Sequence, residues 1–277
     1  MKQFFRRILP PLAYDALRWC LRPEARRPAR EPVLFSGNFA GWREAQSAST
    51  GYNAPVILEK TKSAMLKIKQ GEALFERDGL LLPSAETPLP LLAGLLRAAT
   101  ENNGRLHVLD FGGALGSSYF QCRQFLAPLP HVRWSVVEQP AHVACGAVDF
   151  ADEHLQFFLD VSSAFKSGHP DVLLLSSVLQ YLPEPTATLA DLLAHRFKYV
   201  VVDRTLFHSG VGNRLTVQRV PEWIYPASYP AWFFSEPDFR SHFVSGYEWV
   251  ADFEALDQPS LPDAHAYAKG MIFRLRS

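Results

Sequence analysis

The feature that most constrains the fold is the alternation of strand-like and helix-like segments that begins after Gly104. Short apolar runs alternate with stretches of helical spacing, an order typical of βαβ units in a parallel sheet. We predict parallel strands at residues 106–111, 133–138, 155–159, 172–176 and 199–203. Two later runs, at 249–256 and 270–275, favour an antiparallel hairpin that closes the sheet. The sequence therefore predicts a doubly wound α/β domain over residues 104–277.

Helical periodicity dominates the region that precedes this domain. The segment PVILEKTKSAMLKIKQG at 55–71 has apolar side chains at an imperfect helical spacing. The segment PLLAGLLRAAT at 90–100 begins with proline and is followed by Asn-Asn-Gly, as expected for a helix and its end. The region is too long for a linker, so we predict a helical cap at 33–103. Within it, Glu76-Arg77-Asp78 is either part of a lid or a charged surface turn.

The first 30 residues carry eight basic and two acidic side chains in a chain without net charge. Pro10, Pro11 and Asp15 interrupt the apolar run that a secretory signal would need. We predict a basic amphipathic helix and a linker over residues 1–32. Contact with an anionic membrane surface and packing on the chain's own domain both stay open as its role.

Charge and cysteine content limit the partners and the compartment. Lys+Arg and Asp+Glu both number 28, so no overall field favours nucleic acid. The three cysteines are too few and too far apart for a disulfide framework or a zinc site. No apolar run reaches the roughly 18 residues of a membrane span. We expect a cytoplasmic protein without metal or nucleic acid, with peripheral contact at the inner membrane face as the open alternative.

A glycine-rich loop follows the first predicted strand. The segment DFGGALG, at 110–116, leads into a predicted helix at 117–125. Glycines let the backbone turn sharply and approach a ligand, and the helix start presents free N–H groups to it. The GxGxxG pattern of nicotinamide dinucleotide sites fails, because Ser117 occupies the position of its third glycine. A ligand of another kind is therefore expected at this strand end.

Polar side chains end two further predicted strands. Glu138 ends the second, where a carboxylate can accept hydrogen bonds from both hydroxyls of a ribose. Asp203 ends the fifth and is the leading candidate for a base that acts on a hydroxyl group. Arg204 would hold Asp203 ionised and lower its basicity, and His208 is a second candidate that titrates near neutral pH. A structural Asp–Arg pair and a solvated histidine remain the alternatives.

The D-x-G-x-A-x-G spacing resembles motif I of class I S-adenosylmethionine-dependent methyltransferases. In that family the acidic residue lies near the methionine part of the cofactor and the loop cradles it. The resemblance implies S-adenosylmethionine as cofactor and a site that contains Asp110, Gly112, Gly113, Ala114 and Gly116.

The resemblance extends to two later positions. The family often places an adenine contact where Asp160 stands, although an N-cap role for Asp160 is equally open. SSVLQYLPEP resembles the VLxHLPDP segment of many members, which implies a cofactor role for Ser177. Gln180 and Tyr181 replace the family's histidine region, so no catalytic role carries over there; we retain Tyr181 as a substrate candidate.

Residues 35–234 also resemble a narrower family of methyltransferases, commonly encoded among bacterial surface-polysaccharide biosynthesis genes. The matching segments include FSGNFAGW, GYNAPVILEK, GEALFERDG, VLDFGGALGSSYFQ, RLTVQRVP and IYPASYPAWFFS. This resemblance implies a Rossmann-like class I sheet and O-methylation of a sugar or glycan precursor. Tyr225, Tyr229 and Trp232, in an expected aromatic, proline-stiffened loop, are candidates for contact with a small-molecule or glycan acceptor.

Two other classes of function remain open. A non-catalytic cofactor-binding or scaffold protein of a glycan assembly complex would show the same motifs. An NAD(P)-dependent oxidoreductase would use the same kind of sheet, but the glycine spacing and the absence of a recognisable Tyr-xxx-Lys pair disfavour it.

Overall fold

The computed structural model describes residues 34–51, 55–77, 79–82, 87–222, 224–255 and 258–276. The predicted basic helix and linker at 1–32 and the lid residue Asp78 lie outside the described residues. From Val33 to Ser277 the chain forms one compact unit. Among the described residues, no helix is both long enough and apolar enough to cross a membrane.

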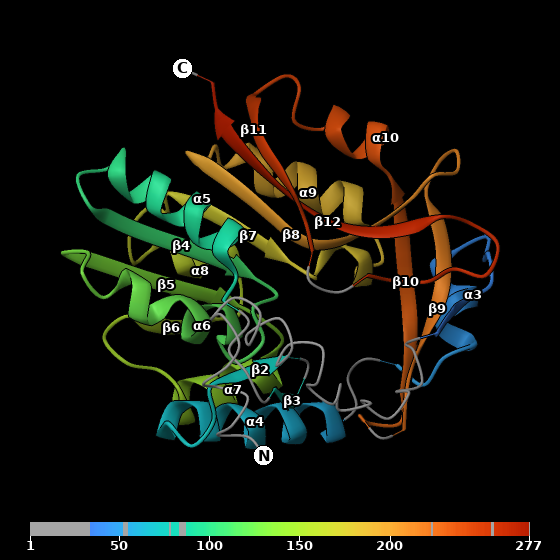
Figure 1. Ribbon diagram of the computed structural model, residues 1–277, viewed down its shortest axis with the longest axis horizontal. Coiled ribbons are helices and arrows are strands. Elements are labelled where there is room, and N and C mark those ends of the chain that lie inside the picture. The colour runs from blue at the N-terminus through green and yellow to red at the C-terminus, as the bar shows by residue number, and fades with distance from the viewer. Residues whose placement is uncertain are drawn as a thin grey trace, which may run out of the picture. The chain divides into compact units, whose positions relative to one another are not determined.

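The seven strands predicted after Gly104 all form and belong to one sheet (Figure 1). They are β4 (Arg105–Phe111), β5 (His131–Val137), β6 (Leu155–Phe158), β7 (Val172–Ser176), β8 (Tyr199–His208), β11 (Tyr247–Glu254) and β12 (Ala266–Leu275). The order β6-β5-β4-β7-β8 is parallel throughout, and β12 lies antiparallel between β8 and β11. Strand order reverses between β4 and β7, as in doubly wound folds. The predicted Rossmann-like, mostly parallel sheet with its antiparallel C-terminal hairpin is confirmed.

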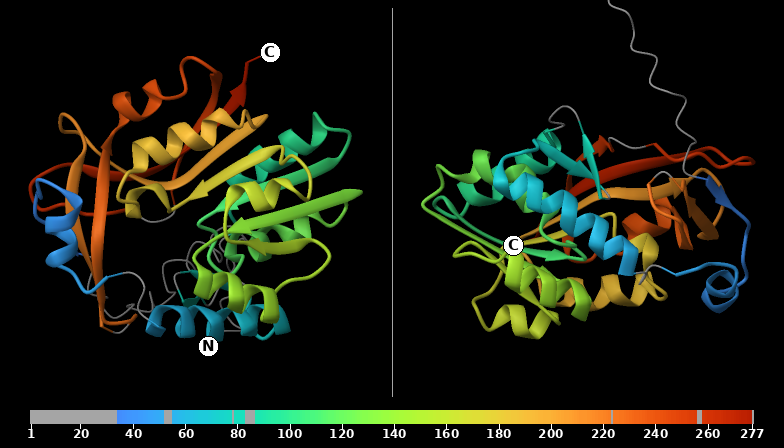
Figure 2. Two further views of the ribbon diagram at one scale, coloured as in Figure 1. Left: turned by 180° about the vertical axis from the view of Figure 1, so that it is seen from behind. Right: turned by 90° about the horizontal axis from the view of Figure 1, so that it is seen from below.

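Helices cover both faces of this sheet (Figures 1 and 2). One face packs against α5 (Leu89–Thr100), α6 (Ser117–Leu126) and the C-terminal end of α7 (Pro140–Asp149), and α4 (Pro55–Gln70) lies against α6 and α7. The other packs against α8 (Val161–Phe165), α9 (Pro185–Ala194), α10 (Glu236–Ser241) and the 3₁₀ turn η1 (Leu179–Tyr181). The near-continuous apolar runs of β7 and β8 follow from burial on both faces.

The region before the sheet contains the helices expected at 55–71 and 90–100, as α4 and α5. α5 has proline in its first turn and buries Leu91, Leu95 and Ala98 against the sheet. The region also holds short elements that the sequence did not reveal. These are β1 (Leu34–Ser36), α3 (Trp42–Ser47), β2 (Phe75–Arg77) and β3 (Leu80–Leu82).

The aromatic segment that we expected to be a loop is instead strand β10 (Ala227–Ser235), so that prediction is wrong. β10 pairs antiparallel with β9 (Arg214–Val220), and β9 pairs with β1. Pro230 is tolerated because, among the described strands, β10 has only β9 beside it at that position; β8 joins at Phe234. A proline needs no hydrogen-bond partner on an open edge.

β8 is longer than predicted because it changes neighbours along its length. Its first half pairs with β7 as far as the Ser176–Asp203 pair, and its last residues pair with β10 at Phe207 and His208. Between them Arg204 has φ +50°, and the pairing with β12 shifts register opposite this point. The strand therefore passes Asp203 and continues into the β9–β10 wall.

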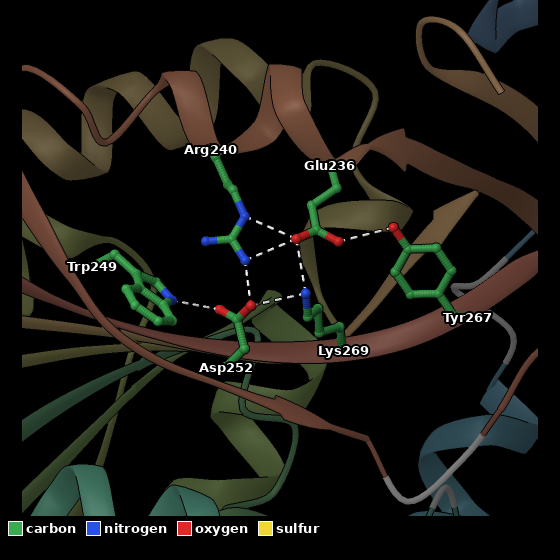
Figure 3. A network of polar contacts seen from close by, with 6 residues as sticks. All are labelled: Glu236, Arg240, Trp249, Asp252, Tyr267 and Lys269. Carbon is green, nitrogen blue, oxygen red and sulfur yellow. Dashed lines mark hydrogen bonds and ion pairs between the residues drawn. The ribbon is translucent and has the colours of Figure 1, made fainter. Parts of the chain in front are cut away.

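A polar network joins α10 to the C-terminal hairpin (Figure 3). Its members are Glu236, Arg240, Trp249, Asp252, Tyr267 and Lys269. Lys269 Nζ lies 2.8 Å from carboxylate oxygens of both Glu236 and Asp252, and Arg240 pairs with the same two carboxylates. Trp249 Nε1 donates to Asp252 at 2.6 Å, and the Tyr267 hydroxyl donates to Glu236 at 2.8 Å.

The two carboxyl groups of the network have pKa values below their ordinary range. Burial alone would raise the pKa of Asp252, but its bonds to Lys269 and Trp249 and the Arg240 charge outweigh burial. For Glu236, the bonds from Lys269, Arg240 and Tyr267 likewise outweigh burial. A carboxyl group with a lowered pKa contributes stability above its unfolded pKa, and this is lost as pH falls through the folded value.

Asp252→Asn should lower the free energy of unfolding by about 1–2 kcal/mol at pH 7, because it leaves two partly buried cations with one carboxylate fewer. The difference from the unsubstituted protein should shrink below about pH 4, where Asp252 itself becomes protonated. Urea titrations at a series of pH values measure both effects. Glu72→Gln, at an exposed position, is the control and should change little. A pH-independent difference would contradict this role of Asp252.

Candidate functional site

Two adjoining cavities lie at the carboxyl ends of the parallel strands, where the strand order reverses. The first is lined by Asp110 and the glycine loop, and by Ser176 and Asp203. The second is lined by Glu138. Gly112, Ser177, Tyr181 and Tyr229 line both, so the two cavities meet there. This is the position at which ligands of open α/β sheets bind.

Asp110, near the end of β4, is a buried carboxyl group with an unused acceptor. It is 1% exposed, and Trp134 Nε1 donates to its Oδ2 at 2.9 Å. Its Oδ1 is buried and has no hydrogen-bond partner among the described residues. Burial raises the pKa of Asp110 to about 7; the Trp134 bond opposes this, and the Glu138 charge adds to it. A ligand donor would satisfy an oxygen that is otherwise costly to bury.

The glycine loop passes so close to its neighbours that two of its positions exclude a side chain. Gly112 has φ +74°, and a Cβ there would lie 2.3 Å from Cγ2 of Val178. A Cβ on Gly113 would lie 2.5 Å from Cγ of Asp110. Ala114 lines the cavity in a left-handed conformation, and Gly116 caps α6 without lining it. Backbone alone therefore faces this part of the cavity.

Glu138 and Asp160 follow neighbouring strands but differ in placement. Glu138 lines the second cavity. Asp160 lines neither cavity and caps α8, where its Oδ1 accepts from Ser163 N at 2.7 Å. The N-cap alternative for Asp160 is thus the one that the structure contains.

Asp203 is the second buried carboxyl group of the first cavity. It is 9% exposed, its carbonyl oxygen accepts from Ser177 N at 2.9 Å, and Ser176 Oγ lies 3.5 Å from its Oδ2. Burial raises its pKa despite the opposing charges of Arg204 and Arg77. We expected Arg204 to lower the basicity of Asp203; the net direction is the reverse, because desolvation is the largest effect.

Tyrosine side chains form the wall opposite the glycine loop. The Tyr181 hydroxyl donates to Gln218 Oε1 at 2.9 Å, and the Tyr181 and Tyr229 rings meet edge to face at 5.3 Å. Tyr225 lines the same cavity. Gln218 was missed in the sequence, because β9 was not predicted and nothing in the sequence pointed to its position.

Two predicted residues are not brought to either cavity. His208 is buried; its Nε2 lies 2.9 Å from the carbonyl oxygen of Gly212, and its Nδ1 accepts from Gly210 N at 3.1 Å. Trp232 stacks on Trp42 and donates its Nε1–H to the carbonyl oxygen of Leu182 at 3.1 Å. His208 is thus held by its own turn and Trp232 by distant Trp42 and Leu182, and neither side chain lines a cavity.

The β2–β3 hairpin packs on the start of α6 and is not a plain surface turn. Glu76 is 2% exposed and accepts from Ser117 Oγ at 2.8 Å and from Gly79 N at 2.6 Å. Gln121 Nε2 donates to the carbonyl oxygen of Glu76 at 3.0 Å. Arg77, the next residue, lines the first cavity. The hairpin thus joins the site to the region before the sheet.

No metal site is found in the part of the chain that the structure describes, since no group of three or more His, Cys, Asp or Glu side chains there is arranged to hold an ion.

Comparison with known proteins gives structural similarities only. No protein-family model matches the chain, and no curated protein matches it. The structure is similar to a 1,6-didemethyltoxoflavin-N1-methyltransferase from Burkholderia thailandensis, at 18% identity and a TM-score of 0.44 over 82% of this chain and 93% of that one. It is similar to an N-methyltransferase from Bradyrhizobium japonicum, at 15% identity and a TM-score of 0.43 over 76% and 99%.

A third similar structure is an amino pentose methyltransferase from Micromonospora echinaspora, at 16% identity and a TM-score of 0.40 over 68% of this chain and 91% of that one. At such identities the site of this chain has to be assigned from its own residues.

The raised pKa of Asp110 gives a stability test of the site. Its folded pKa of about 7 lies above the unfolded value of about 4, so its ionisation costs stability as pH rises between the two. Asp110→Asn keeps an acceptor for Trp134 but cannot ionise. Its free energy of unfolding, relative to that of the unsubstituted protein, should therefore be higher at pH 8 than at pH 5 by about 2–3 kcal/mol. Chemical denaturation at both pH values measures this. A constant difference would show that Asp110 does not titrate there.

Proposed function

We propose that this protein is an S-adenosylmethionine-dependent methyltransferase. The observation that carries the proposal is the placement of Asp110, the glycine loop and Glu138 around two joined cavities at the switch point of a class I sheet. Each of these residues was assigned to the cofactor from its place in the sequence, and all of them lie at the carboxyl edge of the sheet.

The residues that line the two cavities fit S-adenosylmethionine. The unpartnered Oδ1 of Asp110 offers an acceptor for an ammonium group, and the side-chain-free surface at Gly112 and Gly113 leaves room for close approach. Glu138, in the adjoining cavity, would accept from the ribose hydroxyls. Ser177 lies where the cavities meet, which suits the part of the cofactor between its nucleoside and its amino acid.

When bound, S-adenosylmethionine supplies a methyl group on a positively charged sulfur that is open to in-line attack. The protein's task is then to orient the acceptor, exclude water and take up a proton. Asp203 is suited to the last role, because its burial raises its pKa and so strengthens it as a base. Asp203 of β8 lies beside Ser176 and Ser177 at the end of β7, next to the proposed cofactor region.

We propose a hydroxyl group of a sugar or glycan precursor as the acceptor. Tyr181, Tyr225 and Tyr229 offer aromatic faces of the kind that sugar rings pack against, and Gln218 adds a polar group. The similarity of the segments around these residues to methyltransferases of surface-polysaccharide loci supports the same class. A small, enclosed set of tyrosines and charged side chains suits a small molecule better than a protein or nucleic acid.

Glu138→Ala should weaken S-adenosylmethionine binding by roughly 1.5–3 kcal/mol, as expected for lost hydrogen bonds to a charged group. Isothermal titration calorimetry measures the affinity. Glu153→Ala removes an exposed carboxylate and should leave it unchanged. If the unsubstituted protein binds NAD(P) instead of S-adenosylmethionine, the cofactor assignment is wrong. If Glu138→Ala binds S-adenosylmethionine normally, the role of Glu138 is wrong.

Asp203→Asn should lower turnover with the preferred acceptor by about 100-fold or more, as is typical for loss of a general base. Cofactor affinity should be retained, since the amide keeps the shape of the side chain. A screen with labelled cofactor and sugar, small-molecule and protein acceptors identifies that acceptor and measures the loss. His208→Asn, at a residue outside the cavities, is the control. Methylation of proteins with sugars inert would overturn the carbohydrate class, and no turnover at all would favour a scaffold role.

A further inference from the structure

The β2–β3 hairpin, which lies outside the large sheet, contributes side chains to the first cavity. Glu76 is buried, and its carboxylate accepts from the hydroxyl of Ser117, the first residue of α6 after the glycine loop. Gln121, one turn further along α6, donates to the Glu76 carbonyl oxygen. These two bonds hold the hairpin over the start of α6. They also fix the position from which Arg77, the next residue, lines the cavity.

The charges of this cavity suit only part of the proposed cofactor. Asp110 and Asp203 are acidic and complement an ammonium group and a sulfonium. A carboxylate in the same space would be repelled by both when they are ionised, and it needs a cation nearby. Among the described residues that line this cavity, Arg77 and Arg204 are the basic ones.

Of these two arginines, Arg77 is the better placed for the end of the cofactor that lies against the glycine loop. Arg204 is in β8, two strands away from β4, and its peptide is held by a bond from Gln180 Nε2 to its carbonyl oxygen. Arg77 directly follows Glu76, whose carboxylate accepts from Ser117 at the start of α6, and it lines the same cavity as Gly112 and Gly113. Its charge also reaches the middle of the cavity, since it lowers the pKa of Asp203 against the effect of burial.

We infer that Arg77 binds the carboxylate of the amino-acid end of S-adenosylmethionine, and that Glu76 positions it. This inference rests on the proposed function. A guanidinium can engage a carboxylate through two parallel N–H donors, which gives both affinity and orientation. The two charges of the amino-acid end of S-adenosylmethionine would then bind different residues: Asp110 would bind the ammonium group, and Arg77 would bind the carboxylate. Cofactor recognition would in this way include a hairpin that lies outside the Rossmann-like sheet.

A purely structural role makes a different prediction. If Arg77 served only to balance the charge of buried Asp203, its loss would change turnover and its pH dependence without regard to which ligand is bound. If it contacts the carboxylate, its loss matters only for ligands that carry one. Ligand discrimination in a binding measurement therefore separates the two roles without requiring the acceptor.

The experiment compares Arg77→Ala with the unsubstituted full-length protein by calorimetry, using three ligands. S-adenosylhomocysteine carries the carboxylate, decarboxylated S-adenosylmethionine lacks it but keeps the ammonium and sulfonium groups, and 5′-methylthioadenosine lacks the whole amino acid. We expect Arg77→Ala to weaken S-adenosylhomocysteine binding by about 10- to 100-fold and to leave the other two affinities within about twofold. Arg77→Lys, which keeps the charge but not the paired donors, should give an intermediate loss.

Arg105→Ala is the matched control, because Arg105 is exposed at the amino end of β4, away from the cavity. Equal losses for all three ligands, or none for S-adenosylhomocysteine, would overturn the role of Arg77 while leaving cofactor binding established. Failure of the unsubstituted protein to bind any of the three ligands would overturn the proposed function itself. Thermal unfolding of each variant verifies that it folds.

Discussion

The structure depends most on the change of neighbours along β8. Up to Asp203 this strand pairs with β7, and from Phe207 it pairs with β10 on the same edge while β12 follows the other edge throughout. The left-handed conformation of Arg204 marks the transition. Because β7 ends there, the carboxyl edge of the sheet opens at Asp203. Because the last residues of β10 pair with β8 just beyond that point, the β9–β10 wall stands beside the opening, and Tyr229 of β10 lines the same cavity as the glycine loop.

Three buried carboxyl groups surround that opening, and the cost of burying each is offset in a different way. Asp110 has one bond from Trp134 and a pKa of about 7, so it is partly protonated near neutral pH. Glu76 accepts from Ser117 and Gly79 beside the positive end of α6. Asp203 has the charges of Arg204 and Arg77 near it. In the C-terminal hairpin, by contrast, Glu236 and Asp252 are fully paired with cations and serve stability.

The parts of the fold that could be predicted are those with local periodicity or a motif. The strands from β4 to β8, the hairpin of β11 and β12 and the helices α4 and α5 all have such a signal. The glycine loop was recognised by its spacing, and Glu138 by its place at a strand end. Gly112 and Gly113 prove to be positions where a Cβ would collide with Val178 and Asp110, which spacing alone did not reveal.

Sequence by itself thus determined the parallel strands, the C-terminal hairpin and the glycine loop, because these follow from short-range patterns. Only the tertiary structure decided which other residues line the cavities and how β1, β9 and β10 extend the sheet. Leu34 of β1 pairs with Arg219 of β9, far apart in the sequence, and β10 contains a proline that local rules assign to a loop. The burial that raises the pKa of Asp203, the contact of Glu76 with Ser117 and the bond from Trp232 to Leu182 all result from packing between distant segments. No pattern within a window of a few residues records such packing.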